Sequence, residues 1–182
     1  PAKVKPEDVD DYAERAGPRF KGGICARSSD RVYNLSLVGA LIEAWGADKA
    51  GAWAKGIVAN MARPPEGGDR DQIRAVAAGV CEIAITNTNY FIRMATGEDA
   101  ADRAVGGKLK LAFPGLDGKG THVNISGGGV ARNAPNKTNA IRLREFFASA
   151  KAQTHISANN NEYPASPDVP APPPVDAYAQ FT

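Results

Sequence analysis

The chain has 182 residues, of which 43% are hydrophobic and 23% are charged, an ordinary composition for a globular protein. The net charge of +2 comes without a basic run or an arginine cluster, so nucleic acid is not an expected partner. No apolar stretch approaches the length of a membrane span. The length suits one domain or two small lobes.

The first two thirds of the chain alternate predicted helices and strands. In chain order we expect a helix from Pro6 to Gly17, a strand in GGICARS, helices at about 34–45 and 47–61, a helix at 69–79 capped by Asp69 and ended by Gly79, a strand in CEIAITN, a helix from about Thr88, a helix at 98–105 and a strand in KLKLAF. This alternation predicts an α/β fold with a largely parallel sheet flanked by helices.

The last third has a different character. THVNIS alternates like a strand, GGG follows at residues 127–129, and a helix is expected from about residue 135 to 151. Its apolar positions form a stripe that predicts a core-facing side: Ile141, Leu143, Phe146 and Phe147. From about residue 164 the chain is rich in proline, which favours an extended surface segment.

The cysteines and histidines form no metal-binding pattern. Cys25 and Cys81 each lie in a strand-like run, so one disulfide or two buried thiols are both possible. Neither belongs to a CxxC motif, and His122 is expected to be a structural residue of a strand. No nucleophile–base pair is visible, so we do not expect an enzyme.

Ser28 and Ser29 follow a strand, where they would either bind an anion at a helix N-terminus or cap that helix.

Two tyrosines follow predicted strands at the point where a helix begins. Tyr33 comes after the first strand, and Tyr90 lies in TNTNYFIRM after another. The carboxyl ends of parallel strands share one edge of a sheet, so the two phenols could converge there. Phenolate is a hard anionic donor that suits a trivalent cation such as Fe(III). The alternative for Tyr90 is that Asn87 or Thr88 caps the helix while the tyrosine packs in the core.

Three segments resemble the ferric-iron-binding periplasmic proteins, the transferrin-like substrate-binding components of bacterial iron ABC transporters. They are ICARSSDRVYNLSLVGALI, AKGIVANMARPPEGGDRDQIRAVAAGVCEIAITNT and LDGKGTHVNISGGGVARNAPNKTNAIRLREFF. The similarity extends from about residue 3 to residue 168, and the RSS…YN and GGDRDQI segments are specific for the family.

The resemblance implies a two-lobed fold that holds Fe(III), together with carbonate or another small anion, in its cleft. It places Tyr33 as the first tyrosine ligand of the C-terminal lobe. The family motif of Asn-Thr followed by two tyrosines reads Asn87-Thr88-Asn89-Tyr90 here, so Tyr90 would be a remaining ligand. Asn89 then replaces a ligand, and Asn87 and Asn89 would lie beside the metal ligands; Ser28 and Ser29 are the candidates for binding the anion.

The resemblance also predicts a division of the chain. Residues 1–17 would be a linker helix, 18–108 an α/β domain like the C-terminal lobe, 109–163 a segment that crosses back to the other lobe, and 164–182 a proline-rich tail. Family members have further segments on both sides of this region. Together with the start at Pro1, this suggests a trimmed product or a piece of a longer protein. The uncovered part of the second lobe suggests self-association.

The functional expectation is a periplasmic Fe(III)-binding protein that delivers iron to the permease of an inner-membrane ABC transporter. The alternative is a degenerate relative that no longer binds metal and serves as an interaction or structural module. Export to an oxidising compartment, together with the placement of both cysteines on strands of one sheet, predicts a Cys25–Cys81 disulfide.

Overall fold

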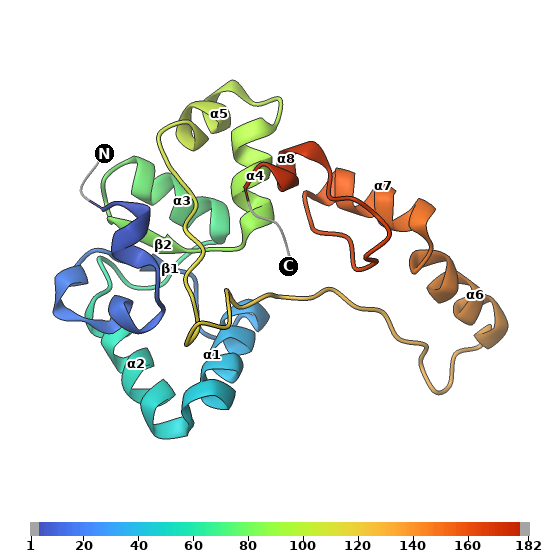
Figure 1. The fold of residues 1–182 in the computed structure, drawn as a ribbon, viewed down its shortest axis with the longest axis horizontal. Coiled ribbons are helices and arrows are strands. Elements are labelled where there is room, and N and C mark those ends of the chain that lie inside the picture. Colours follow the sequence, from blue (N-terminus) through green and yellow to red (C-terminus); the bar gives the residue numbers. More distant parts are fainter. Residues whose placement is uncertain (1–3, 179–182) are drawn as a thin grey trace. The chain divides into compact units, whose positions relative to one another are not determined.

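The structure is a computed structural model that describes residues 4–178 (Figure 1). Residues 1–3 and 179–182, which are the ends of the expected linker helix and of the proline-rich tail, lie outside the described residues. The elements in chain order are η1 (Pro6–Val9), η2 (Ala13–Ala16), η3 (Pro18–Phe20), β1 (Ile24–Ala26), α1 (Val32–Trp45), α2 (Ala47–Ala59), α3 (Asp69–Ala77), β2 (Ile83–Ile85), α4 (Thr88–Thr96), α5 (Ala100–Gly106), α6 (Lys137–Phe147), α7 (Ala150–Asn160) and α8 (Pro173–Asp176).

The chain divides into two compact units between Asn124 and Ile125. Residues 109–124, which the sequence assigns to a returning segment, therefore belong to the first compact unit. None of the described helices is long and apolar enough to cross a membrane.

The first unit is organised around a short parallel sheet. β1 pairs with β2 in the register Ile24–Ile83, Cys25–Ala84 and Ala26–Ile85. All three residues of β1 are buried, as expected for a strand that is covered on both faces. The predicted α/β class with parallel strands is confirmed, although the sheet is small.

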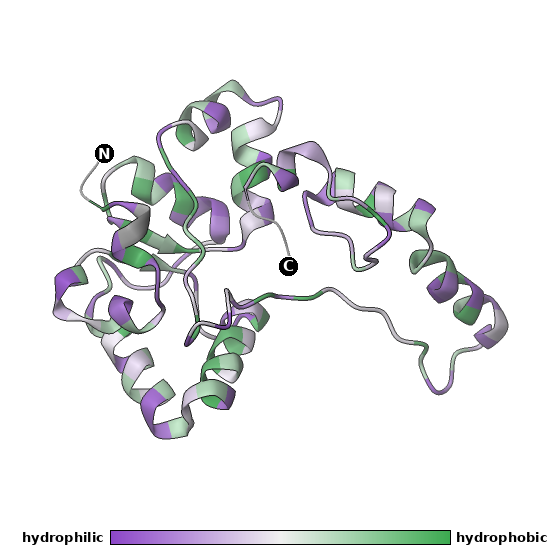
Figure 2. Cartoon of the chain, viewed as in Figure 1, coloured by the Kyte–Doolittle hydropathy of each residue, from purple (hydrophilic) through white to green (hydrophobic). Residues whose placement is uncertain are grey.

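The larger core lies on one face of the sheet. Ile24 packs there with Leu41 of α1 and with Trp53 and Ile57 of α2. Figure 2 shows hydrophobic residues in green along α1 and in the sheet. The indole Nε1 of Trp53 donates a hydrogen bond of 2.6 Å to the carbonyl oxygen of Tyr12, which holds the N-terminal segment against α2. Burial of this apolar surface is the main favourable term for the unit.

The opposite face of the sheet carries a smaller core with the disulfide. Cys25 and Cys81 are bonded, as predicted, and pack with Ala75 of α3. Cys81 lies two residues before β2 and not on the strand itself, which corrects the expected placement. Because successive residues of a strand point to opposite faces, Ile24 and Cys25 serve the two cores separately.

The helix expected from Pro6 to Gly17 is wrong, because the segment forms two short 3₁₀ helices. Between them, Asp11 forms an isolated parallel bridge with Gly115. The amide of Gly115 donates to the carbonyl of Asp10, and the amide of Tyr12 donates to the carbonyl of Gly115. These contacts with a distant loop take backbone groups that a continuous helix would use internally.

The two strands expected in KLKLAF and THVNIS are also wrong. Among residues 4–178, only β1 and β2 form a sheet, and the segments 108–113 and 121–126 are irregular. A strand needs a neighbouring strand to accept its hydrogen bonds, and alternating hydrophobicity alone does not supply one. Ala112 nevertheless packs against the larger core, so part of its segment remains a packing element.

The second unit contains α6, α7 and α8. The single helix expected at 135–151 is interrupted, because Ser149 caps a new helix by accepting a hydrogen bond of 3.4 Å from the amide of Ala152. The stripe on α6 does not face a core: Leu143, Phe146 and Phe147 are 47–52% exposed.

The proline-rich segment is not extended throughout, because Pro173–Asp176 forms one helical turn, with proline in its first positions.

Candidate functional site

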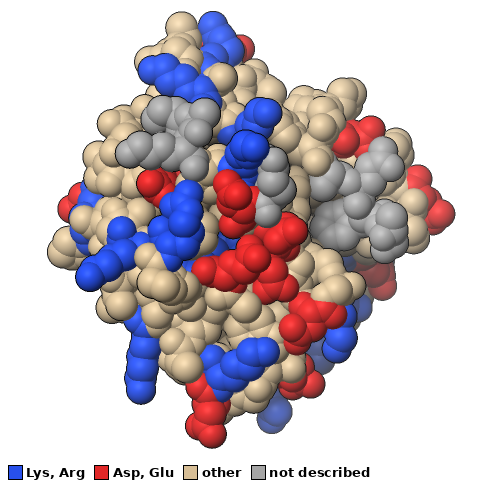
Figure 3. Space-filling model, turned by 60° about the vertical axis from the view of Figure 1, so that its left-hand side comes forward, with Lys and Arg blue, Asp and Glu red and all other residues tan. Residues whose placement is uncertain are grey.

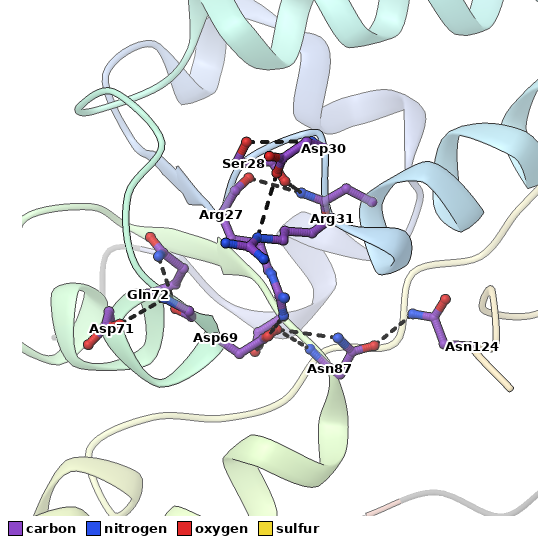
Figure 4. Close-up of polar contacts among 12 residues, drawn as sticks. Arg27, Ser28, Asp30, Arg31, Asp69, Asp71, Gln72, Asn87 and Asn124 are labelled. Carbon is purple, nitrogen blue, oxygen red and sulfur yellow. Dashed lines mark hydrogen bonds and ion pairs between the residues drawn. The ribbon is translucent and has the colours of Figure 1, made fainter. Parts of the chain in front are cut away.

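The carboxyl ends of β1 and β2 lie at the same edge of the sheet because the strands are parallel and in register. β1 continues into Arg27 and Ser28, and β2 continues into Thr86 and Asn87. Helix α1 begins shortly after the first of these ends, and helix α4 begins directly after the second. Figure 4 shows the polar side chains that gather at this edge.

The structure brings the two tyrosines together at this edge. Tyr33 is the second residue of α1 and Tyr90 is the third residue of α4, and both are half-buried. The neighbouring Tyr90 phenol raises the pKa of Tyr33 above its usual value near 10, and partial burial adds to this effect. Two phenolic oxygens from separate helices are therefore neighbours at this edge of the sheet.

Arg27 lies against this pair of phenols. Its guanidinium carbon is 4.9 Å from the centroid of the Tyr33 ring, within the range of a cation–π interaction. The positive charge opposes the rise in the pKa of the Tyr33 phenol. The guanidinium is paired with the carboxylate of Asp69, and the buried Nε has no hydrogen-bond partner among the described residues. Sequence reasoning did not single out Arg27.

Asp69 is the centre of the polar network. Its side chain is almost completely buried, and Oδ1 accepts hydrogen bonds from Thr86 Oγ1 at 2.9 Å, from the Asn87 amide at 3.0 Å and from Asn87 Nδ2 at 3.3 Å. The prediction that Asp69 caps α3 is therefore wrong. Gly68 occupies the cap position, and Asp71 accepts the bond from the Gly68 amide.

Asn87 and Asn89 lie beside the tyrosines, as their places in the sequence require. Asn87 occupies the N-cap position of α4, but its side chain does not bond to that helix. Instead, Asn87 Oδ1 accepts a hydrogen bond of 2.7 Å from Asn124 Nδ2, in addition to the contacts with Asp69. Asn89 is half-buried, and no hydrogen bond reaches its side chain within the described part of the chain.

Ser28 and Ser29 do not cap α1. The cap position belongs to Arg31, and the helix begins at Val32. Ser28 Oγ accepts a long hydrogen bond of 3.4 Å from the Asp30 amide, and Ser29 is exposed. The capping alternative is wrong for both serines, and anion binding by them stays a prediction.

A short segment before the boundary of the first unit extends the network. His122 Nε2 lies 3.1 Å from Ser36 Oγ on α1 and 3.3 Å from Asn124 Oδ1. His122 is therefore not a strand residue but part of a polar contact between this segment and α1. Sequence reasoning missed Asn124, although its alternation with His122 in THVNIS places both side chains on one side of an extended segment.

The donor chemistry of the site is phenolic. Within residues 4–178, no group of three or more His, Cys, Asp or Glu side chains could hold a metal ion.

On the face drawn in Figure 3, acidic side chains lie among Lys and Arg side chains, so the two signs of charge are mixed.

Comparison with protein families identifies the chain. Residues 6–182 match the model of a family described as bacterial extracellular solute-binding protein. The chain belongs to this family. Membership confirms the expectation of a binding protein in place of an enzyme. Structural similarity to a ferric binding protein confirms the expected lobe of a periplasmic binding protein.

The chain is similar to several iron proteins. It is 43% identical to "Iron uptake protein A1" of Synechocystis, over 98% of this chain and 50% of that protein. It is 46% identical to a Trichodesmium protein (IdiA, FutA) solved in complex with iron and citrate, with a TM-score of 0.92 over 98% of this chain and 57% of the other. A ferric binding protein from Campylobacter jejuni gives a TM-score of 0.93 at 34% identity, over 99% and 57% of the two chains. The predicted resemblance is confirmed, and the chain spans about half the length of the curated relatives that it matches.

Proposed function

We propose that this chain binds Fe(III) as cargo through the phenolic oxygens of Tyr33 and Tyr90. The observation that carries the proposal is that Tyr33 and Tyr90, in the first turns of α1 and α4, are neighbours at the common edge of β1 and β2. Supporting it, the chain is 43% identical to a Synechocystis iron uptake protein. Phenolates are hard donors, and a ferric ion that binds both oxygens displaces the proton of each phenol.

The two tyrosines supply only part of the roughly six-coordinate sphere that an octahedral ferric ion requires. A small anion is the expected additional ligand, and carbonate or citrate both offer hard oxygen donors. The Trichodesmium relative was solved with iron and citrate, which supports an anion of this kind. Ser28 and Ser29, which follow Arg27 at the end of β1, are the proposed anion contacts.

The proposed setting is the periplasm, where the protein passes iron to the permease of an ABC transporter in the inner membrane. Residues 18–108 would correspond to most of the C-terminal lobe, preceded by a linker at 1–17. Residues 109–163 would cross back toward the other lobe, and 164–182 would form a tail. Since the relatives are about twice as long, the remaining metal ligands would come from outside the matched region.

Ferric loading of the full chain tests the proposal. Bound tyrosinates give a ligand-to-metal charge-transfer band in the visible range, so we expect coloured protein after addition of ferric citrate. Tyr90→Phe keeps the ring and removes the donor oxygen, so the fold should persist while the band weakens strongly. Tyr163→Phe in the second unit is the matched control and should leave the band unchanged. If Tyr90→Phe binds ferric ion as well as the parent, the assignment of the site is wrong.

One observation favours a second candidate function. Asn89 stands where the family motif has a tyrosine, and a neutral amide is a poorer donor for Fe(III) than phenolate. A chain that no longer binds metal would serve as an interaction or structural module. Absence of the visible band after ferric loading would favour this candidate, and light scattering would show whether the chain self-associates.

A further inference from the structure

We propose that Asp69 is a positioning residue of the ferric site, which holds the guanidinium of Arg27 against the ring of Tyr33. This inference rests on the proposed function, because it assigns a role within the same site. Within the described part of the chain, Asp69 forms its hydrogen bonds and its ion pair with Arg27, Thr86 and Asn87 and not with either phenol. Its positioning effect on the site passes through Arg27, in addition to the direct effect of its own charge.

The position of the Asp69 carboxylate is fixed by its surroundings. The side chain is 1% exposed, and Oδ1 accepts three hydrogen bonds from the two residues that follow β2. An ionised carboxylate only accepts hydrogen bonds, and its two oxygens offer about four acceptor directions. Oδ1 therefore accepts its hydrogen bonds from Thr86 and Asn87, and Oδ2 can accept from a cation.

Arg27 is the cation that pairs with Oδ2 of Asp69. Its guanidinium pairs with Asp69 Oδ2, and the Arg27 side chain is 14% exposed. The pair links β1 to the first turn of α3, which are 42 positions apart in sequence. A buried cation without its carboxylate is costly, so Arg27 would leave this place if the charge of Asp69 were removed.

Arg27 also contacts Tyr33, the proposed metal ligand. The guanidinium carbon lies 4.9 Å from the centroid of the Tyr33 ring, and a positive charge at this distance favours the phenolate form that binds a cation. Residues that hold a ligand or its neighbours in place change metal affinity by roughly 10–100-fold when they are replaced. The carboxylate of Asp69 therefore determines whether this favourable charge stays beside Tyr33.

The test exploits two effects of opposite sign on the pKa of Tyr33. The charge of Asp69 raises this pKa directly, whereas the charge of Arg27 lowers it. In Asp69→Asn, the amide oxygen can still accept from Thr86 and Asn87, so the start of α4 is preserved. If Asp69 acts only by its own charge, the pKa of Tyr33 falls in this variant. If Asp69 holds Arg27 in place, the guanidinium moves away and the pKa rises, which is the expected result.

The measurement uses the metal-free full chain with ¹³C-labelled tyrosine, followed by NMR of the Tyr33 Cζ signal as pH increases. Tyr33→Phe assigns the signal. Asp71→Asn is the matched control, since it removes a carboxylate from the same helical turn without touching Arg27, and should not shift the Tyr33 titration. A fall or no change in the pKa of Tyr33 in Asp69→Asn overturns the inference.

Ferric binding provides the second readout. Asp69→Asn should weaken binding about 10–100-fold, and Asp71→Asn should not weaken it. If Asp69→Asn does not fold, the double variant Arg27→Gln/Asp69→Asn leaves no unpaired buried charge and is compared with Arg27→Gln alone. Equal ferric affinity of these two variants supports action through Arg27, and a further loss of threefold or more in the double variant overturns it.

The outcomes separate this inference from the proposed function. If the parent chain shows no charge-transfer band, the ferric function fails, but the titration of Tyr33 in the metal-free chain still decides the role of Asp69. If the band is present and the pKa of Tyr33 does not rise in Asp69→Asn, only the inference fails.

Discussion

The guanidinium carbon of Arg27 lies 4.9 Å from the ring centroid of Tyr33, and the phenol of Tyr90 is a second neighbour of the Tyr33 phenol. The two contacts act in opposite directions on the phenolic proton. The neighbouring Tyr90 has the largest effect and favours the protonated form of Tyr33, so the pKa of this phenol is raised. The phenol of Tyr33 therefore holds its proton beside a guanidinium whose charge favours release of that proton.

Ferric binding should tighten as pH rises. A raised pKa favours the protonated phenol, so Tyr33 carries its proton throughout the neutral range and a metal ion must displace it. For each displaced proton the affinity changes about tenfold per pH unit. Competition with citrate at pH 6, 7 and 8, corrected for protonation of citrate, measures the slope. Tyr33→Phe should reduce the slope by one proton, and an unchanged slope would show that Tyr33 is not a ligand.

Asn89→Tyr should strengthen ferric binding by restoring the tyrosine pair of the family motif. The new phenolate would replace a neutral amide as a donor next to Tyr90, and we expect a gain of about tenfold or more, since 1.4 kcal/mol of additional binding energy is sufficient. The intensity of the visible band and the citrate competition both report the gain. Asn89→Phe is the control, because it adds the ring without the oxygen. Equal affinities of the two variants would contradict the prediction.

Loss of the Cys25–Cys81 disulfide should destabilise the first unit. The bond joins residues 56 positions apart, so it restricts a long loop in the unfolded chain. We expect the free energy of unfolding to fall by roughly 2–4 kcal/mol in Cys25→Ala/Cys81→Ala. Urea denaturation with and without a reductant measures the change. The double variant should not respond to the reductant, and a parent chain that is equally insensitive would contradict the prediction.

Gly56→Ala should destabilise the contact between α2 and the N-terminal segment. An added Cβ would lie 2.7 Å from the Cβ of Ala16 and 2.8 Å from its carbonyl oxygen, so one backbone must move. Overpacking of this kind costs roughly 1–3 kcal/mol. In the control Gly51→Ala on the same helix, the added Cβ meets nothing within 4 Å, and a gain of roughly 0.5–1 kcal/mol is expected. Thermal unfolding should therefore move in opposite directions for the two variants.

Most elements of the first unit could be predicted because their signals are local. Helix α1 follows from its apolar periodicity, and the end of α3 follows from Gly79, which has the positive φ of a left-handed residue. The position of Tyr33 and Tyr90 at strand ends was equally visible, because each stands a few residues after an apolar run. The parallel pairing of those runs then brings the phenols to the same edge.

The remaining features depend on partners that are distant in sequence. Asp69 resembles an ordinary helix cap until Arg27 and Thr86 are known to lie beside it, 42 and 17 positions away. The helix expected at 6–17 is interrupted by Gly115, which periodicity cannot reveal. THVNIS has the alternation of a strand, but it has no neighbouring strand in the described part of the chain. Local patterns do not specify such pairings.

The candidate site depends on the long-range pairing of β1 with β2. Helices α1, α2 and α3 separate the two strands in the chain, so their pairing closes a long loop, and contacts of this kind form slowly. Tyr33 and Tyr90 stay apart until that loop is closed. A ligand held by both phenols can bind only the completed unit, and at one hundred times its dissociation constant it adds about 2.7 kcal/mol to the free energy of unfolding. A bound ligand would thus stabilise the folded chain. The chain without ligand would unfold, and be degraded, more readily than the chain with ligand.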